Sequence, residues 1–159
     1  MNNYCFLFLL CGLISTGVAA NEKATAHEKI SDKNAFEAQY IQCIEQGLKA
    51  GCFQSVFSGH FDFQQKQELL APDAESFFIR WMAGLSIYKV HAANKTVKAE
   101  IFDNRSYIIE RSDGELVGFF VGFRSVKGSW YIYDIQGGSS DLYIRRLLDM
   151  PKIRPLDAE

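Results

Sequence analysis

The sequence predicts an α+β domain in which helices come first and an antiparallel sheet follows. Apolar residues recur about every four positions before Gly84 and every two positions after it, and the helical part contains two cysteines, Cys43 and Cys52. Helices followed by strands with short connections are typical of α+β domains. We expect a disulfide-linked helical hairpin and a further helix, packed on a curved antiparallel sheet of four to five strands, and a short C-terminal helix.

The N-terminus has the pattern of an export signal. The apolar run YCFLFLLCGLI is roughly half as long as the ~20 residues of a membrane-spanning helix. Small residues follow it, so we predict a signal peptide over residues 1–20, with Val18 and Ala20 at the recognition positions. The alternatives are a lipid anchor at Cys11, before which the residues are bulky, and a helix buried in the core. We predict export to the periplasm, with secretion as a second possibility, and no stable membrane insertion once the signal is removed.

The remaining chain is long enough for one domain with its own core. Polar residues follow the signal, and the last helical pattern ends just before Pro151. The predicted organisation is a flexible linker over 21–33, a single domain over 34–150 and a loose tail over 151–159.

Two cysteines remain in the exported chain, and in an oxidising compartment they predict one disulfide, Cys43–Cys52. A metal site would need more ligands at close spacing, and His27, His60 and His91 do not supply them. A thioredoxin-like redox pair has two residues between its cysteines, not eight. The structural disulfide is therefore the favoured interpretation.

The disulfide requires the chain to reverse between the cysteines. Nine steps along one helix would separate the two Cα atoms by about 13 Å, and a disulfide tolerates no more than about 7 Å. Gly47 is the expected reversal point, as a left-handed helix end. The first helix is expected to begin with a capping box of Asn34 and Glu37. Its apolar face consists of Phe36, Tyr40, Cys43 and Ile44, and that of the second helix of Leu48, Cys52 and Val56, with Phe53 and Phe57 beside them.

A third helix is predicted in APDAESFFIRWMAG, with Pro72 as its first residue and Gly84 at its end. Trp81 on its apolar face is interpreted as a core residue, with a ligand platform as the alternative. A shorter helix is expected before it in DFQQKQELL, capped by Asp62 and Gln65. The predicted apolar face of the third helix consists of Phe77, Trp81 and Leu85.

Four to five strands are predicted after the helices, one of them in SIYKVHAA before Asn94-Lys95, and short turns make them antiparallel neighbours in chain order. The turns are expected at Asn94-Lys95, Asp113-Gly114 and Lys127-Gly128. In the third strand Gly118 and Gly122 interrupt the face opposite Val117, Phe119, Val121 and Phe123, which predicts a bend or the close approach of another element. A serine-capped helix is expected in SSDLYIRRLLDM. The predicted strands span 96–102, 105–112, 115–126 and 129–137.

The last predicted hairpin carries the pattern Gly128, Trp130, Ile132, Asp134. With the order of elements and the long curved strand, it resembles the nuclear-transport-factor-like superfamily, also called SnoaL-like or cystatin-like cones, over about residues 34–137. The resemblance implies a curved sheet around a helix, often with an apolar pocket. Such cones include isomerases, dehydratases, ligand binders and inert partner modules, so the fold alone chooses none of these functions.

The resemblance also implies that a catalytic member would hold a carboxylate, His or Tyr in its pocket. Asp103, in FDNRSY, is expected in an exposed bend because Asp and Asn favour turns, and His91 is expected near a loop. Asp134 is expected on the face of Trp130 and Ile132, where desolvation would raise its pKa. The residues considered for catalysis are His91, Asp103, Arg105, Tyr107, Tyr133 and Asp134.

Several function classes are disfavoured. The formal charge is −2, which argues against a nucleic-acid footprint, and no serine-elbow, phosphate-loop or zinc motif is present, so no cofactor or metal is predicted. The favoured hypothesis is a small exported non-enzymatic binding protein of the cell envelope, such as an immunity-type inhibitor or an accessory subunit. The alternative is an enzyme or ligand carrier that uses an apolar pocket. The candidate binding residues are Trp81, Arg105, Tyr107, Arg124, Tyr131, Tyr133 and Asp134.

Overall fold

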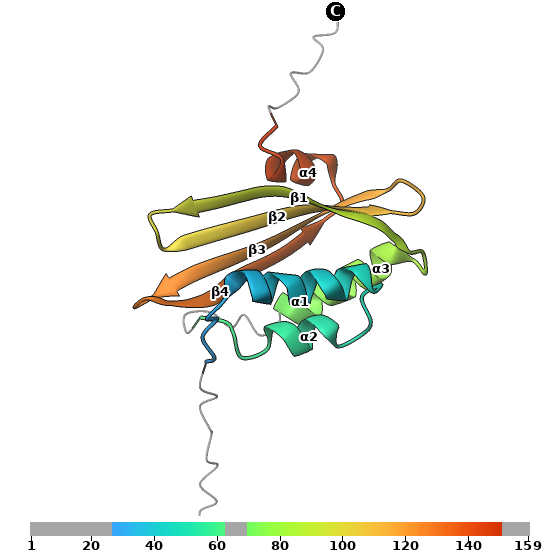
Figure 1. Cartoon of the computed structure of the whole chain (residues 1–159). Helices are drawn as coiled ribbons and strands as arrows, with labels where there is room; N and C mark the ends of the chain where they lie inside the picture. Colours follow the sequence, from blue (N-terminus) through green and yellow to red (C-terminus); the bar gives the residue numbers. More distant parts are fainter. Residues whose placement is uncertain (1–26, 63–69, 151–159) are drawn as a thin grey trace, which may run out of the picture.

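The computed structural model describes residues 27–62 and 70–150 and has the predicted α+β architecture (Figure 1). The predicted signal peptide, the predicted C-terminal tail and most of the expected short helix around Gln65 lie outside the described residues. None of the helices in the described segments is both long and apolar enough to cross a membrane. The elements are α1 (Lys33–Glu45), α2 (Cys52–Phe57), α3 (Leu70–Met82), β1 (Ile87–Lys98), β2 (Phe102–Arg111), β3 (Leu116–Val126), β4 (Ser129–Gly138) and α4 (Asp141–Leu147).

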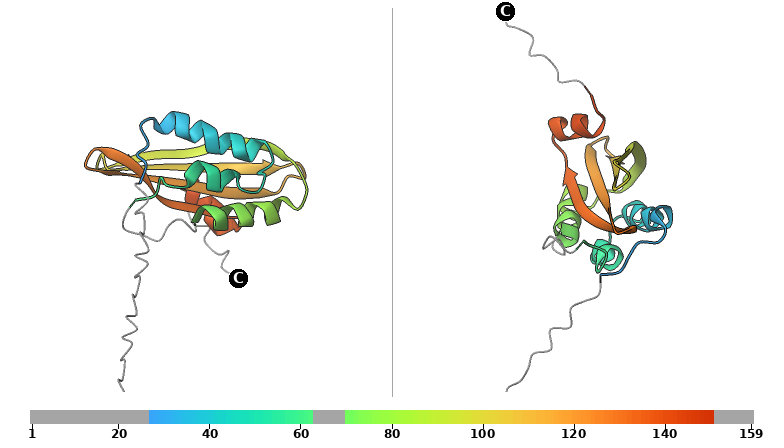
Figure 2. Two further views of the ribbon diagram at one scale, coloured as in Figure 1. Left: turned by 90° about the horizontal axis from the view of Figure 1, so that it is seen from below. Right: turned by 90° about the vertical axis from the view of Figure 1, so that its left-hand side faces the viewer.

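The four strands form one antiparallel sheet in the order β1-β2-β3-β4, as predicted. Helices α1, α2 and α3 cover one side of the sheet, here called the helix face, and α4 lies on the opposite side, the outer face (Figures 1 and 2). On β3 the predicted alternation holds, because Val117, Phe119, Val121 and Phe123 are fully buried on the helix face. Gly118, Phe120 and Gly122 alternate with these residues and therefore lie on the outer face.

The corner between α1 and α2 is the predicted disulfide-linked reversal. Cys43 and Cys52 are bonded, with their Cα atoms 5.9 Å apart, and Gly47 has a φ of 80°. A second link comes from α3, where the buried Glu75 accepts the backbone N–H groups of Gly51 at 2.5 Å and Phe53 at 2.7 Å. A carboxylate at a helix N-terminus satisfies donors that have no partner within the helix. The six residues of α2 are thus tied to α1 by a covalent bond and to α3 by a cap.

The first predicted strand was wrong in its bounds. β1 runs continuously through Asn94-Lys95, and the turn to β2 lies at Ala99 and Glu100, which have φ values of 49° and 58°. Val97 and Ile101 alternate with Lys98 and Glu100 in the sequence, but this pattern does not reflect burial, since Val97 is 60% exposed. The second strand accordingly begins at Phe102 instead of residue 105.

The first helix begins differently from the prediction. Asp32 is the N-cap, and its Oδ1 accepts the N–H groups of Asn34 at 2.8 Å and Ala35 at 3.0 Å. Glu37 is directed instead to the sheet. Packing also starts before the predicted boundary at residue 34, because Ile30 is buried and donates its N–H to the Trp130 carbonyl at 2.9 Å.

Helices α2 and α3 bury different faces from those predicted. On α3, Phe78 is 1% exposed, whereas Phe77 and Trp81 are only partly buried and Leu85 lies beyond the helix end. Leu70 and Ala71 already belong to the helix, so Pro72 is not its first residue. Ala71, Ala74, Glu75 and Met82 complete the buried face of α3, and Phe53 and Phe57 form that of α2.

The two glycines of β3 allow close approach, as expected. A Cβ atom at Gly118 would lie 2.6 Å from Leu147 of α4, and one at Gly122 would lie 2.4 Å from the Tyr133 ring. At Gly122 the β3–β4 register also shifts, because Gly122 pairs with Asp134 and Phe123 with Ile132. Tyr133 is the extra residue of this β-bulge.

Candidate functional site

The helix face of the sheet is occupied by an aromatic core. Tyr40 of α1 stacks on Phe57 of α2, and Phe53 of α2 stacks on Phe119 of β3, each pair with ring centroids 5.4 Å apart. All four side chains are completely buried. In this region the helices pack ring against ring on the sheet, in the offset and edge-to-face arrangements that aromatic pairs prefer.

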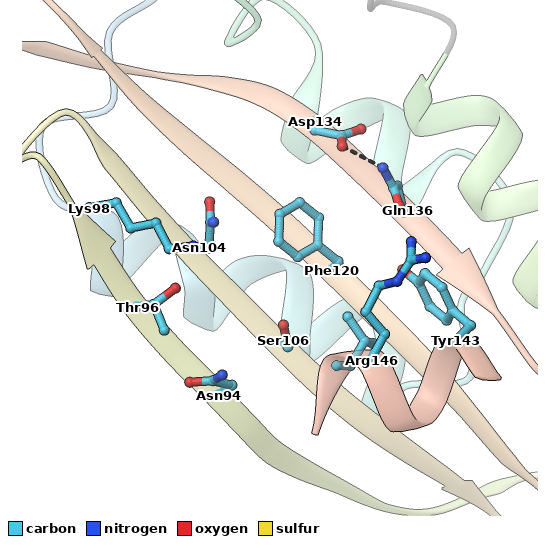
Figure 3. A pocket seen from close by; sticks show the side chains of 11 residues that line it. Asn94, Thr96, Lys98, Asn104, Ser106, Phe120, Asp134, Gln136, Tyr143 and Arg146 are labelled. Atoms are coloured by element: carbon cyan, nitrogen blue, oxygen red, sulfur yellow. Dashed lines mark hydrogen bonds between the residues drawn. The ribbon is translucent and has the colours of Figure 1, made fainter. Parts of the chain in front are cut away.

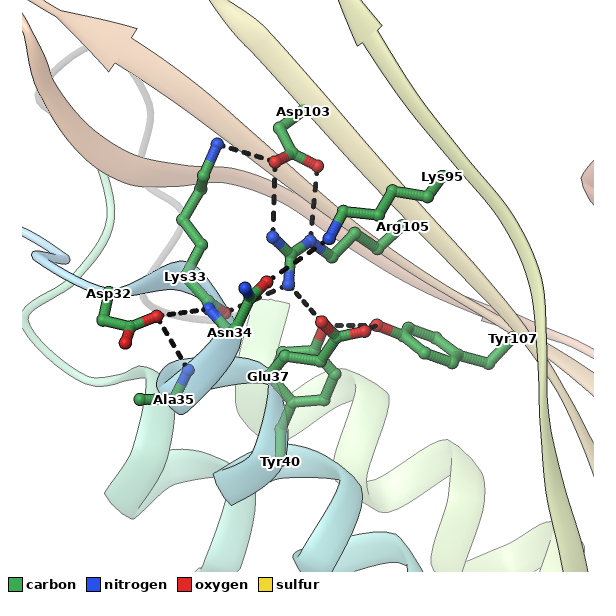
Figure 4. A network of polar contacts seen from close by, with 10 residues as sticks. All are labelled: Asp32, Lys33, Asn34, Ala35, Glu37, Tyr40, Lys95, Asp103, Arg105 and Tyr107. Atoms are coloured by element: carbon green, nitrogen blue, oxygen red, sulfur yellow. Dashed lines mark hydrogen bonds and ion pairs between the residues drawn. The ribbon is translucent and has the colours of Figure 1, made fainter.

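Beside this core lies a buried ion network that includes Asp103 and Arg105 (Figure 4). The segment FDNRSY is therefore part of β2 and not the exposed bend that was predicted. Arg105 is 2% exposed, and its Nε and Nη2 donate to the Asp103 carboxylate, each at 3.3 Å. Its Nη1 donates to Glu37 of α1 and to the Lys33 carbonyl. The Lys33 ammonium lies 2.6 Å from Asp103. The network therefore clamps the first turns of α1 onto β2.

Two phenols extend the network into the core. The hydroxyls of Tyr40 and Tyr107 lie 2.7 Å apart, and Tyr107 donates to Glu37. Burial raises the pKa of both phenols far above the usual value, so both stay neutral. Burial alone would raise the pKa of Asp103, but hydrogen bonds from Arg105 and Lys33 lower it below its usual value.

These contacts assign the network a structural role. Arg105 and Tyr107 each bind other groups of the protein and are almost completely buried. Buried polar groups are costly unless paired, and here the partners come from α1 and β2. Two of the seven candidate binding residues thus lie inside the domain.

A second polar cluster lies on the outer face, in an open groove of about 350 Å³. Strands β1 to β4 form its floor and α4 its wall, and Phe120 stands in the middle of the floor (Figure 3). The neutral polar side chains that line it are Asn94, Thr96, Asn104, Ser106, Gln136 and Tyr143. Hydroxyl and amide groups can both donate and accept hydrogen bonds, so this lining suits a ligand with many polar atoms.

Asp134 belongs to this groove, and its predicted face was wrong. The bulge at Tyr133 lets Asp134 pair with Gly122 and places its side chain on the outer face, while Ile132 stays buried on the helix face. Burial raises the pKa of Asp134, in the predicted direction, although a hydrogen bond from Gln136 at 2.6 Å opposes that shift. The carboxylate is therefore partly desolvated at the edge of an open groove.

Two tyrosines near Asp134 differ in their hydrogen bonding. The Tyr133 hydroxyl donates to Asn104 Oδ1 at 2.8 Å, and its ring packs edge-on against Phe120. The Tyr143 hydroxyl is buried and has no hydrogen-bond partner among the described residues. Burial, with a smaller contribution from the Asp134 charge, raises the pKa of Tyr143 to about 12. Tyr143 therefore lines the groove with its side chain, while its neutral hydroxyl is buried next to it.

The groove also carries two cationic side chains at its margins. Lys98 lies near the end of β1 and Arg146 on α4, and both are exposed (Figure 3). Within residues 27–62 and 70–150 neither forms an ion pair. By contrast, the neighbouring Arg145 pairs with Asp141 at 2.6 Å. The margins of the groove are thus positively charged.

The other predicted residues lie apart. Trp81 packs under the guanidinium of Arg111, 5.0 Å from the ring centre, and Arg124 donates to Asp62 at 3.0 Å. Tyr131 is on the outer face, opposite Arg124 in the register. His91, expected near a loop, is within β1 and lies 3.2 Å from Glu110. The seven candidates therefore do not form one surface, and only Tyr133 and Asp134 adjoin the groove.

Sequence reasoning missed most of the groove. Phe120 alternates with the buried Phe119 and Val121, and this period-two pattern was the available signal for its outward position, whereas Asn104 is flanked by the buried charges of Asp103 and Arg105, which give no such signal. Tyr143 and Arg146 are recognisable only once α4 is known to pack over Gly118. No group of three or more metal-ligating residues occurs in the described segments. The groove offers hydrogen bonds, one carboxylate and two cations, which suit recognition.

Comparison with known proteins finds no family model, curated protein or solved structure that matches the chain. The resemblance to nuclear-transport-factor-like cones therefore remains a prediction.

Proposed function

We propose that the chain is a non-enzymatic binding protein of the cell envelope and that the outer-face groove is its recognition surface. The observation that carries this proposal is the composition of the outer-face groove, on which polar side chains from three strands and α4 converge around Phe120 of β3. On the helix face the space beneath α1 and α2 is filled by buried aromatic rings, and the open depression between α1 and β1, of about 360 Å³, lies beside the structural network of Glu37 and Tyr107.

The chemistry of the groove supports binding more than catalysis. Proton transfer needs an acid or base held in place next to the reacting atom. Asp134 is the one carboxylate of the groove lining, and its nearest partner is the neutral amide of Gln136. An open, water-accessible groove also gives little of the desolvation that strengthens catalytic electrostatics.

Export is part of the proposal. The apolar N-terminal run with small residues at its end favours it, and the Cys43–Cys52 disulfide is compatible with an oxidising compartment. A role as an immunity-type inhibitor or accessory subunit remains within this proposal. An enzyme or carrier for small molecules is the second candidate, favoured by the raised pKa of Asp134.

The test places a photo-crosslinking phenylalanine analogue at Asn94, an exposed residue of the groove, in intact cells that produce the protein. The matched control carries the analogue at Gln54, which is exposed on α2 on the other side of the sheet. The proposal expects a crosslinked product from position 94 and none from position 54. Equal products from both sites, or none from position 94, would overturn it.

Three substitutions, tested for the cellular phenotype, distinguish binding from catalysis. Asn94→Trp should obstruct the groove and abolish the cellular phenotype, whereas Gln54→Trp should not. Asp134→Asn keeps the shape of the side chain and removes its acid–base capacity, so the phenotype should survive. Loss of the phenotype in Asp134→Asn, with thermal stability intact, would identify the enzyme instead.

A further inference from the structure

We propose that the outer-face groove binds an acidic oligosaccharide, a chain of hydroxylated rings that carries carboxylate groups. This inference rests on the proposed function, since it assigns a ligand class to the same surface. Four features of the groove support this ligand class: its hydrogen-bonding capacity, the aromatic ring on its floor, its charged margins and the pairing of the strands below it.

The lining matches a ligand rich in hydroxyl groups. Amide side chains from three strands and hydroxyls from two strands and α4 surround the groove. Sugar hydroxyls both donate and accept, which is what amides and hydroxyls complement. The Tyr143 hydroxyl adds an independent observation, because it is buried and has no hydrogen-bond partner in the described residues. Such orphaned groups are rare, and a ligand acceptor would satisfy this one once the side chains that cover it shift aside.

Phe120 supplies an apolar surface at the centre of the polar lining. Its side chain stands on the groove floor, half-buried, with the Tyr133 ring edge-on at 6.5 Å between centroids (Figure 3). The C–H groups on one side of a sugar ring form an apolar patch that packs on an aromatic ring, while the hydroxyls at its rim reach polar neighbours. A floor of one ring surrounded by polar groups fits that division.

The charges favour an anionic sugar. Lys98 and Arg146 flank the groove, form no ion pair within residues 27–62 and 70–150, and outnumber the single carboxylate Asp134. Carboxylates on a flexible chain can reach both margins.

The sheet itself disfavours an extended peptide. Peptides commonly bind sheets by adding a strand at an edge, where backbone groups are unpaired. The middle of this groove lies over β2 and β3, which pair with neighbours on both sides. Their backbone N–H and C=O groups are engaged in the ladders, so only side chains face the ligand.

The test is calorimetric titration of the oxidised protein with a hexamer of galacturonic acid, a neutral maltohexaose and a hexamer of glutamic acid. We expect the acidic sugar to bind with a Kd below about 1 mM, at least about tenfold more tightly than either comparison ligand. Equal or tighter binding of hexaglutamate would show that charge or a peptide is recognised, and no binding of the acidic sugar would equally overturn the inference.

Three variants locate the binding. Tyr143→Phe removes a hydroxyl without a described protein partner, so binding should weaken by about tenfold while thermal stability is unchanged or raised. Replacing Lys98 and Arg146 together by Gln should weaken binding by about tenfold and reduce its salt dependence. The charge-matched control replaces Lys49 and Arg80 by Gln. Both residues are exposed and lie away from the groove, so this variant should bind the sugar like the parent. Unchanged binding in the first two variants would overturn the assignment.

The proposed recognition surface and the proposed sugar ligand can be refuted independently. If position 94 crosslinks to a protein in cells while hexagalacturonate does not bind, the sugar assignment is wrong and the recognition surface stands. If the sugar binds and Asn94→Trp leaves both its binding and the cellular phenotype unchanged, the groove is not the surface and both are wrong.

Discussion

Replacing Arg105 with Met should be among the most destabilising single substitutions in the domain. The arginine side chain is 2% exposed and Asp103 only 3% exposed, so the substitution leaves a buried carboxylate with Lys33 as its remaining ionic partner. Removing one member of a buried ion network costs about 3–5 kcal/mol, because the other charge stays desolvated. For a domain of this size the melting temperature should fall by roughly 12–20 °C.

The same reasoning predicts that a double variant is less damaged than the single one. Asp103→Leu combined with Arg105→Met removes both deeply buried charges together. The charges left behind, on Lys33 and Glu37, are 20% and 26% exposed and can reach water. The double variant should therefore lose less than about 2 kcal/mol, since apolar replacement of a whole buried ion pair is often nearly neutral.

Urea unfolding at pH 7, followed by circular dichroism, measures the free energies of unfolding of the parent, Arg105→Met, Asp103→Leu and the double variant. Arg145→Met is the control, because its partner Asp141 is 75% exposed and such pairs contribute only about 0.3–0.5 kcal/mol. A loss below about 1 kcal/mol for Arg105→Met, or additive losses in the double variant, would refute the account of a mutually dependent buried network.

Three further predictions concern the disulfide, the bulge and the two carboxylates. Cys43→Ser should lower stability by about 2.5 kcal/mol, the chain-entropy value for cysteines nine positions apart, and dithiothreitol should lower the melting temperature of the parent but not of the variant. Gly122→Val should cost about 1–3 kcal/mol in urea unfolding, and adding Tyr133→Ala should recover part of it, because the new side chain meets that ring. If the second change gives no relief, the clash is not the cause. The pKa of Asp134 is raised in the folded state, so its ionisation makes the folded protein less stable as the pH rises above the usual pKa of 3.8. Asp134→Asn should therefore raise the melting temperature at pH 7. Asp103 has a lowered pKa, so its stabilisation is present above 3.8 and is lost as pH falls, and Asp103→Asn should lower the melting temperature at pH 7. Melting curves between pH 3 and 7 check both, and shifts of the same sign at pH 7 would contradict the argument.

Local sequence signals predicted the later strands well. β3 and β4 were placed within one residue of their ends, because Asp113-Gly114 and Lys127-Gly128 favour tight turns. The β1–β2 turn was missed because Ala99 and Glu100 adopt positive φ without a glycine. Residues of this kind rarely do so, and nothing in a short window indicates it.

The candidate site was harder to predict for a different reason. Arg105 was considered for binding because arginine is common at interfaces, yet its partners, Lys33 and Glu37, lie about 70 positions earlier in the chain. Burial of a charge depends on such distant partners, which a local pattern does not contain. The direction of the Asp134 pKa shift was predicted correctly, but the β-bulge moved that residue to the other side of the sheet.

The contact between Tyr40 and Tyr107 has a consequence for the order in which the chain folds. The two residues are 67 positions apart, so during synthesis the apolar side of α1 emerges long before the strand that covers it. The hairpins of the sheet, by contrast, join neighbouring segments and close over short loops, which is the faster process. The α1–α2 hairpin is equally local, so both halves should form on their own before the Tyr40–Tyr107 contact docks one on the other.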